Sequence, residues 1–233
     1  MNLFEEYVKG YDFGNKKIEV KYRHTLRVKV LCELIAKDLG LDKEQIKLAS
    51  LCGVFHDIAR FEQVKRFDSF DDYTTIDHGD LGYEIFLNEF ADKLDLSEKD
   101  KMIIAKSIKY HNKHKVENVN EEELLFTNIV RDADKIDIMY IYANVPGMIA
   151  DGEGEITDDI REVFYSHKSI ERKTADCSRE TVVLALAFIW DINFDCSYKI
   201  IKENKYYDKI KKILNNSVYD EFFEEINKFL KEK

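Results

Sequence analysis

Proline and glycine are scarce along this chain, and their scarcity restricts the folds open to it. Pro146 is the only proline, and the 233 residues include nine glycines. Strand-rich folds need turns at short intervals, and those turns depend largely on these two residue types. Over long segments the apolar residues instead recur with the 3.6-residue period of an amphipathic helix. The sequence therefore predicts an all-α fold.

Helix start and stop signals divide the first half of the chain into expected elements. We expect a first long helix over residues 19–39 and a second over 42–58, which Asp42 caps. Ser97 and Asn120 predict two further helix starts of the same kind. Each predicted helix has one apolar face, as a helix that packs against a core requires.

Two segments between the expected helices lack a helical pattern. The polar and aromatic stretch "VKRFDSFDDYTTID", residues 64–77, is too long for a tight connection and is a candidate lid over a site. The stretch "NVPGMIADGEGEITDD", residues 144–159, is the clearest break in the chain. Amphipathic helices are expected after it, near 180–190 and 198–214, followed by a charged helix at the carboxyl terminus.

Charge and hydropathy exclude several classes of protein. The formal net charge of −10 argues against binding to bulk nucleic acid, because a phosphate backbone needs a basic surface. The longest apolar run, residues 181–190, is too short to cross a bilayer, so no membrane partner is expected. The amino terminus "MNLFEEYVKGYDFG" lacks the pattern of a secretory signal. We expect a cytoplasmic protein.

Several histidines and aspartates lie on expected helices where an apolar stripe should face the core. That placement is unusual for side chains with polar or charged groups. The residues that share it are His24, His56, Asp57, His78, His111 and Asp134. They come from five separate helical segments.

A single buried histidine is most often a core residue that is hydrogen-bonded to a neighbouring carbonyl. The occurrence of such residues in five segments favours a different interpretation. A buried carboxylate costs several kcal/mol unless a cation or hydrogen bonds compensate it. A divalent metal compensates carboxylates and imidazoles together. Mixed imidazole and carboxylate ligands without thiolate suit iron, manganese, cobalt, nickel or zinc rather than calcium.

The order of these residues resembles a known family signature. His24, then His56–Asp57, then Asp134 is similar to the H…HD…D pattern of the HD superfamily of metal-dependent phosphohydrolases. The resemblance covers roughly residues 20–142 and is carried by "YRHTLRV", "LCGVFHDIARFEQ" and "VRDADKIDIMY". It implies an HD-domain-like helical bundle with additional C-terminal helices. We expect a single HD-type domain over 1–233, with its metal-binding core at about 19–143 and a helical extension at about 155–233.

The resemblance also implies roles for the metal ligands. In this family the four signature residues hold one metal, and members with further histidines before the last aspartate hold two. His78 and His111 stand in those places, with Asp57 implied as the bridge between two ions. Some two-metal members carry another histidine where this chain has Asn112, which implies a second site that is weaker or holds more water.

The implied activity is hydrolysis of a phosphoester or phosphoanhydride bond in a nucleotide or another small phosphorylated metabolite. Metal ions would lower the pKa of a bound water and neutralise phosphoryl charge. Arg60 is expected to help hold the phosphate. Lys135, directly after a signature residue, is either a substrate contact or a surface lysine. Glu62 is either the proton donor to the leaving group or a residue that fixes the following loop.

Other interpretations of the same residues stay open. A few proteins that resemble this superfamily use the six-ligand arrangement for di-iron oxygen chemistry. A non-catalytic sensor or interaction domain that keeps the metal for stability is a third interpretation. The segment after Gly154 is consistent with either a homodimer face or a cover over the site.

Overall fold

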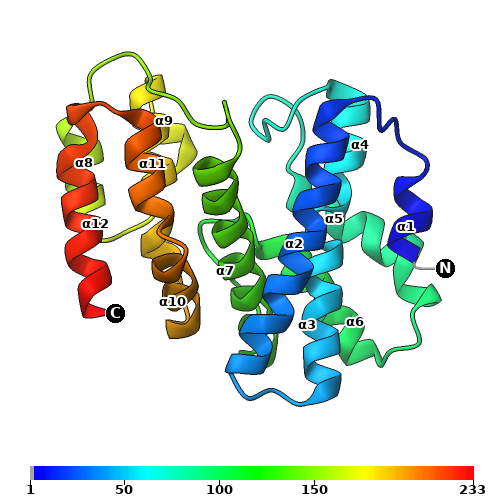
Figure 1. Cartoon of the computed structure of the whole chain (residues 1–233). Helices are drawn as coiled ribbons and strands as arrows, with labels where there is room; N and C mark the ends of the chain where they lie inside the picture. Colours follow the sequence, from blue (N-terminus) through cyan, green and yellow to red (C-terminus); the bar gives the residue numbers. More distant parts are fainter. Residues whose placement is uncertain (1–2) are drawn as a thin grey trace. The chain divides into compact units, whose positions relative to one another are not determined.

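The structure, a computed structural model, describes residues 3–233 as helices joined by loops (Figure 1). No strand occurs among these residues, which confirms the predicted all-α class. Contacts divide the chain into two compact units, one ending at Ala133 and the other comprising Asp134–Lys233. The arrangement of the whole chain as a single domain stays a prediction.

The first unit contains most of the residues expected to bind metal. Its helical elements are α1 (Leu3–Val8), α2 (Lys16–Asp38), α3 (Lys43–Phe55), α4 (Ile58–Phe67), α5 (His78–Ile85), a π-helical turn η1 (Phe86–Phe90), a 3-10 turn η2 (Ala91–Lys93), α6 (Glu98–Tyr110) and the first part of α7 (Glu121–Asn144). Helix α7 runs without interruption through the boundary at Ala133 into the second unit.

The predicted helix starts are confirmed by their capping hydrogen bonds. Asp42 accepts from the Gln45 backbone N–H while the Gln45 side chain accepts from that of Asp42, a complete capping box. The Ser97 side chain caps α6 in the same place that the sequence indicated. At the start of α7, Asn120 and Glu123 exchange a second reciprocal pair of bonds.

Helices α2 and α3 pack side by side and form the centre of the first unit (Figure 1). Cys32 and Ile35 on α2 and Cys52 on α3 are fully buried. Gly53 permits the close approach: a Cβ there would lie 2.9 Å from the Cys32 Sγ and 3.0 Å from the Cα of Lys29. Helix α6 packs against both α3 and α5, so the carboxyl ends of α3 and α6 and the start of α5 are brought into one unit.

The prediction of one continuous second helix over 42–58 is wrong, because the structure has a break inside this range. Helix α3 ends at Phe55, and α4 begins at Ile58. Asp57 has φ −108° and ψ 21°, outside the helical region, so the two helices are separate. His56 follows the last residue of α3 and Asp57 precedes the first residue of α4, so the two side chains leave the backbone from two different helix ends.

The second unit contains the shorter helices. They are the end of α7, α8 (Asp158–Tyr165), η3 (Arg172–Thr174), α9 (Ser178–Leu186), η4 (Ala187–Asp191), α10 (Asp195–Glu203), α11 (Tyr206–Leu214), η5 (Ser217–Tyr219) and α12 (Asp220–Glu232). The helix expected over 198–214 is two helices, because Lys205 adopts the left-handed conformation with φ 52°. The helix expected near 180–190 ends in a 3-10 segment.

Aromatic packing builds the core of the second unit. The Phe164 ring contacts Trp190 at a centroid distance of 5.3 Å and Phe222 at 4.9 Å. Glu180 is buried, and its carboxylate accepts hydrogen bonds from the Thr157 backbone and hydroxyl and from the Asp176 backbone. Burial raises the pKa of this carboxyl, but the hydrogen bonds from Thr157 outweigh burial and hold the pKa below its ordinary value.

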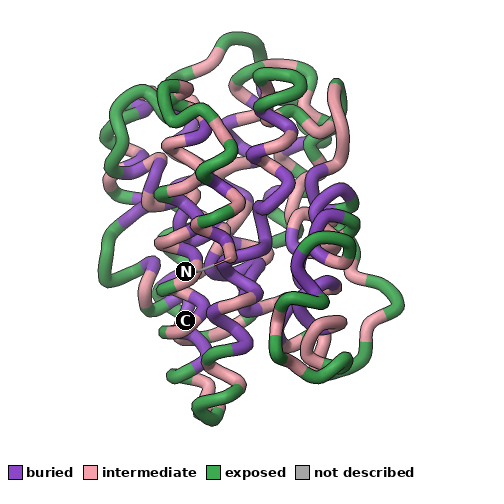
Figure 2. Tube along the Cα trace, turned by 90° about the vertical axis from the view of Figure 1, so that its right-hand side faces the viewer, coloured by how far each residue is buried: buried purple, intermediate pink, exposed green. Residues whose placement is uncertain are grey.

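Burial follows the amphipathic pattern of the sequence. Along the helices the trace alternates between buried and exposed stretches, and the loops are mainly exposed (Figure 2). No helix within residues 3–233 has the length and apolar character needed to cross a membrane.

Candidate metal centre

Five of the expected ligands meet in the first unit, and four of them lie at helix ends. His24 is in the middle of α2, His56 follows the last residue of α3, Asp57 precedes α4, His78 begins α5, and His111 follows α6. The exposed fractions of these five residues are 1%, 0%, 2%, 3% and 3%, in that order. The five side chains therefore share one enclosed site.

The Asp57 carboxylate is at the centre of this cluster and presents each of its oxygens to a different pair of histidines. Oδ2 lies 3.4 Å from the Nε2 atoms of both His24 and His56. Oδ1 lies 3.3 Å from Nε2 of His78 and 3.5 Å from Nε2 of His111. We call the first set the His24–His56 half-site and the second the His78–His111 half-site.

The nitrogen–nitrogen distances fit two ligands of one ion in each half-site. Nε2 of His24 is 3.2 Å from Nε2 of His56, and Nε2 of His78 is 3.0 Å from Nε2 of His111. Two nitrogens bound to one ion at about 2.1 Å lie about 3.0 Å apart at a right angle and about 3.4 Å apart at a tetrahedral angle. Both observed distances fall within this range.

Hydrogen bonds on the other ring nitrogen leave Nε2 available in three of the histidines. Nδ1 of His56 donates to the Gly53 carbonyl at 2.7 Å, and Nδ1 of His111 donates to the Ile108 carbonyl at 2.7 Å. Nδ1 of His78 lies 2.6 Å from Oδ2 of Asp72. In a neutral imidazole with its proton on Nδ1, Nε2 carries a lone pair.

The cluster therefore has the chemistry of a cation site. The Nε2 lone pairs of His56 and His111 face the Asp57 oxygens, which are also acceptors, and an acceptor facing an acceptor is unfavourable without a cation between them. Ligand atoms of His56, Asp57 and His111 all lie within 4.8 Å of one another. These residues fit a divalent metal with mixed imidazole and carboxylate ligands.

Two cationic side chains flank the shared carboxylate. The Lys21 Nζ lies 2.6 Å from Asp57 Oδ2, and the Arg60 Nε lies 3.7 Å from Asp57 Oδ1. Both cations approach the ring of Phe70, at 5.4 and 5.6 Å from its centroid. The Arg60 Nε is buried without a hydrogen-bond partner. Lys21 was not predicted from the sequence, although it lies three residues before His24 and so on the same face of its helix.

The charges around Asp57 determine its ionisation. Burial alone would raise the pKa of this carboxyl, but the Lys21 cation and the neighbouring histidines outweigh burial and hold the pKa well below its usual range. Burial lowers the pKa of His78 to about 4, and the Arg60 charge acts in the same direction. Near neutral pH the site thus combines an ionised carboxylate with a neutral His78 imidazole.

The remaining predicted catalytic residues lie in other environments. The Glu62 carboxylate accepts from Arg66 at 2.7 Å and from the Tyr11 hydroxyl at 3.2 Å. Burial raises the pKa of Glu62, but the Arg66 hydrogen bond and the Lys65 charge outweigh it and keep the pKa below its ordinary value. This arrangement fits the interpretation in which Glu62 fixes the structure around it.

Asp134 and Lys135 belong to the second unit. Asp134 is half-buried and directly follows Ala133 within α7. Lys135 is buried rather than on the surface, and its Nζ forms an ion pair with Asp191 at 2.8 Å. Their roles as a ligand and a substrate contact stay predictions.

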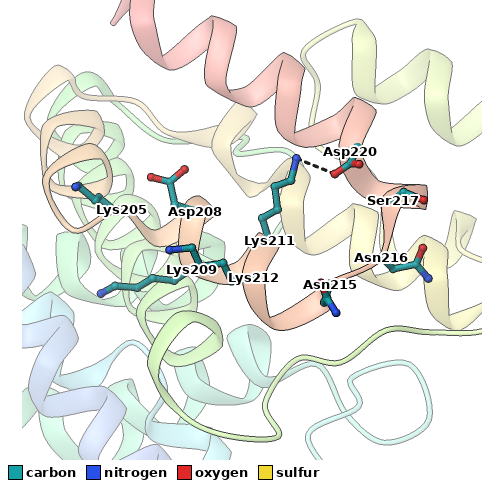
Figure 3. Close-up of a pocket in the computed structure, with 9 residues that line it drawn as sticks. All are labelled: Lys205, Asp208, Lys209, Lys211, Lys212, Asn215, Asn216, Ser217 and Asp220. Atoms are coloured by element: carbon teal, nitrogen blue, oxygen red, sulfur yellow. Dashed lines mark ion pairs between the residues drawn. The ribbon is translucent and has the colours of Figure 1, made fainter.

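A pocket of about 740 Å³ in the second unit contains none of the expected ligands. Its lining comes from α11, the residues that flank this helix, η5 and the first residue of α12, and Figure 3 shows several lysines of α11 around it. Only one of these lysines, Lys211, is drawn in an ion pair, with Asp220 at 2.7 Å. The pocket lacks the buried, convergent groups that distinguish the cluster around Asp57.

Gly79 controls how closely α5 approaches α6 beside the metal cluster. A Cβ at Gly79 would lie 2.7 Å from the Lys109 carbonyl oxygen and 2.5 Å from Oδ1 of Asn112. We expect Gly79→Ala to destabilise the protein by about 1–2 kcal/mol, because overpacking costs about 1–3 kcal/mol and exceeds the helix-propensity gain of about 0.5–1 kcal/mol. Denaturant unfolding measures the change.

The same substitution should weaken metal binding, since it displaces His78 from His111. Gly10→Ala is a matched control, because its new methyl comes no closer than 3.3 Å to the Tyr7 carbonyl oxygen. Equal effects of the two substitutions on stability and on metal affinity would contradict the expectation.

Comparison with known protein families identifies the family of this chain. The HD domain family model matches residues 22–139, a little more than half of the chain. The chain belongs to the HD domain family. The matched HD domain region includes all six expected metal ligands, from His24 to Asp134.

One curated relative of this HD domain protein is similar over most of both chains. It is the symmetrical bis(5'-nucleosyl)-tetraphosphatase of Staphylococcus aureus (strain NCTC 8325 / PS 47), 23% identical over 192 residues, which cover 76% of this chain and 85% of the relative. No solved structure matches the chain significantly.

Proposed function

We propose that this HD domain protein is a metal-dependent phosphohydrolase. Its substrate would be a nucleotide or another small phosphorylated metabolite, and the bond cleaved a phosphoester or phosphoanhydride. The observation that carries the proposal is the Asp57 carboxylate, each of whose oxygens faces the Nε2 atoms of two buried histidines. The curated relative, a bis(5'-nucleosyl)-tetraphosphatase, supports a phosphorylated nucleotide as the substrate class.

The proposed ligands are divided between two ions, whose identity is iron, manganese, cobalt, nickel or zinc. His24, His56 and Oδ2 of Asp57 would hold one ion, and His78, His111 and Oδ1 of Asp57 would hold the other. We assign Asp134 to the first ion from its place in the family signature. When bound, such ions activate a water as nucleophile and neutralise charge on phosphoryl oxygens.

Arg60 is well placed to bind a phosphate oxygen beside Asp57. Its Nη1 donates to the Gln63 side chain at 2.7 Å, the Phe70 carbonyl at 2.7 Å and the Asp72 carboxylate at 2.8 Å. These bonds hold the guanidinium in one orientation, while its Nε has no hydrogen-bond partner. A fixed donor loses little conformational entropy when it binds an anion.

Lys21 is a second candidate for phosphate binding, because it carries the positive charge closest to Asp57. Lys135 would have to leave its ion pair with Asp191 before it could contact a substrate. We propose no proton-donor role for Glu62, since a donor must be protonated at the working pH and the Arg66 contact favours the ionised form of Glu62.

The proposal is tested with metal-free protein reloaded with Mn²⁺, Co²⁺, Fe²⁺ or Zn²⁺. Phosphate or nucleotide release is measured on nucleoside mono-, di- and triphosphates, a cyclic nucleotide, a bis(5'-nucleosyl) tetraphosphate and a simple aryl phosphate. Asp57→Asn, loaded in the same way, is the control. The proposal fails if no substrate is cleaved faster by the wild-type protein than by the control.

Zinc separates hydrolysis from the di-iron interpretation. Zn²⁺ has no redox chemistry, so turnover of a phosphoester by the zinc form supports hydrolysis. Oxygen uptake that occurs only with the iron form would instead favour an oxygenase. Metal binding with stabilisation but without turnover would favour a non-catalytic domain.

A further inference from the structure

The loop between α4 and α5, residues 68–77, places one carboxylate against the metal cluster. Asp72 in this loop is half-buried, whereas its neighbour Asp71 is exposed. Asp72 is not part of the signature His24, His56–Asp57, Asp134, and no role was predicted for it from the sequence.

The two oxygens of Asp72 bind donors on opposite sides. Oδ1 accepts from Arg60 Nη1 at 2.8 Å and from Gln63 Nε2 at 3.0 Å. Oδ2 accepts from Nδ1 of His78 at 2.6 Å, with the Asn112 Nδ2 at 3.4 Å. One carboxylate therefore connects the proposed phosphate-binding arginine to a proposed metal ligand.

Residues on both sides of Asp72 anchor the loop. Gln63 Nε2 also donates to the Thr75 hydroxyl at 2.8 Å and to the Ile76 carbonyl at 3.0 Å. The Phe70 carbonyl accepts from Arg60 at 2.7 Å. Hydrogen bonds from α4 thus hold the loop on both sides of Asp72.

His78 needs this carboxylate because of its position in α5. His56 and His111 stand at the carboxyl ends of their helices, so each donates its Nδ1 proton to the carbonyl three residues earlier. His78 is the first residue of α5, and no preceding turn of its own helix offers it a carbonyl. Asp72 supplies the missing acceptor.

A carboxylate only accepts hydrogen bonds, so Asp72 holds the His78 proton on Nδ1. The lone pair is then on Nε2, which faces Asp57 Oδ1 at 3.3 Å and the His111 Nε2 at 3.0 Å. With the proton on Nε2 instead, His78 could not bind an ion in the His78–His111 half-site. A carboxylate that orients a metal-binding histidine typically affects metal affinity about 10–100-fold.

We propose that Asp72 is a positioning residue that selects the metal-binding tautomer of His78 and at the same time fixes the guanidinium of Arg60. The inference rests on the proposed metal site, and it adds that the loop 68–77 controls the second metal ion and the phosphate-binding arginine together. The Asp72 carboxylate bonds Arg60, Gln63, His78 and Asn112, so the inference concerns the His78–His111 half-site.

Asp72→Asn separates this role from general packing. An asparagine keeps one acceptor oxygen and gains an NH₂ group. Because Arg60 and Gln63 are both donors, the oxygen should face them and the NH₂ should face Nδ1 of His78. The histidine proton then moves to Nε2, and the lone pair needed for metal binding is lost from that nitrogen.

The first measurement uses metal-free full-length protein. Long-range ¹H–¹⁵N spectra of the histidine rings report which nitrogen carries the proton. We expect His78 to be protonated on Nδ1 in the wild-type protein and on Nε2 in Asp72→Asn. A wild-type His78 that is protonated on Nε2 overturns the proposal without any variant being needed.

The second measurement is a Co²⁺ titration followed by visible absorption and calorimetry. Wild-type protein should bind two equivalents, and Asp72→Asn should bind the second about 10–100-fold more weakly while the first is unchanged. Asp71→Asn is the matched control, because its exposed side chain accepts only a local bond from the Tyr73 backbone. It should bind both equivalents as the wild type does.

Two further outcomes overturn the proposal. One is a wild-type protein that binds a single equivalent; the other is an Asp72→Asn protein that keeps both affinities and the wild-type tautomer. Both measurements are made without substrate. A protein that hydrolyses no phosphoester but loses the second equivalent in Asp72→Asn would refute the proposed function and support the role of Asp72.

Discussion

Asp57→Asn is expected to abolish tight binding of both metal equivalents and to reduce hydrolysis by about 10³-fold or more. Asp57 is the residue whose two oxygens face all four histidines, so its replacement damages both half-sites at once. Loss of even one electrostatic group from an active site costs about 10²–10³-fold in rate, and here the metal binding itself is lost. Metal content after gel filtration and initial rates on the best substrate measure the two effects.

Two controls keep this result interpretable. Asp71→Asn introduces the same change at an exposed position and should leave metal content and rate at wild-type levels. Circular dichroism should show that Asp57→Asn retains its helices. An Asp57→Asn protein that keeps two equivalents of metal would show that the shared carboxylate is not a ligand.

Metal loading should produce the second large effect, a rise in thermal stability. A ligand that binds only the folded state stabilises it by about 2.7 kcal/mol per site at a free concentration of 100 Kd, and by about 4.1 kcal/mol at 1,000 Kd. At about 2–4 °C per kcal/mol, each site filled at 100 Kd raises Tm by roughly 5–10 °C. The physical source is the compensation of the buried Asp57 carboxylate and of the four buried histidines around it.

Melting curves of chelator-treated protein with increasing Mn²⁺, Co²⁺ or Zn²⁺ measure this rise. Mg²⁺ is the matched control ion, because it prefers oxygen ligands and should stabilise much less at equal concentration. Asp57→Asn should lose the response to the transition metals. A Tm that depends equally on Mg²⁺ and Mn²⁺, or that rises equally in Asp57→Asn, would contradict metal binding at this cluster.

Local patterns in the sequence were sufficient for the fold class and for much of the element order. The scarcity of proline and glycine predicted an all-α chain, and the capping signals at Asp42, Ser97 and Asn120 marked three helix starts that the structure has. These features are readable because a cap satisfies backbone groups within one helical turn. The break between α3 and α4 was missed because apolar periodicity continues across His56 and Asp57.

The candidate ligands were also visible in the sequence, since a polar residue on an apolar stripe is a local anomaly. The structure brings His24, His56, Asp57, His78 and His111 together in the first unit. The sequence pattern did not reveal which ligand atoms face one another, because that depends on how five helices pack.

The sequence by itself therefore determined the helical class, the main helix starts and a set of inward-facing ligand candidates. Only the tertiary structure decided that each Asp57 oxygen faces a separate pair of imidazoles, that Lys21 lies against Asp57, and that Asp72 connects Arg60 with His78. The physical reason is the range of the interactions. Periodicity and capping act within a turn or two of one helix, whereas these contacts join residues six to 54 positions apart whose side chains meet through packing.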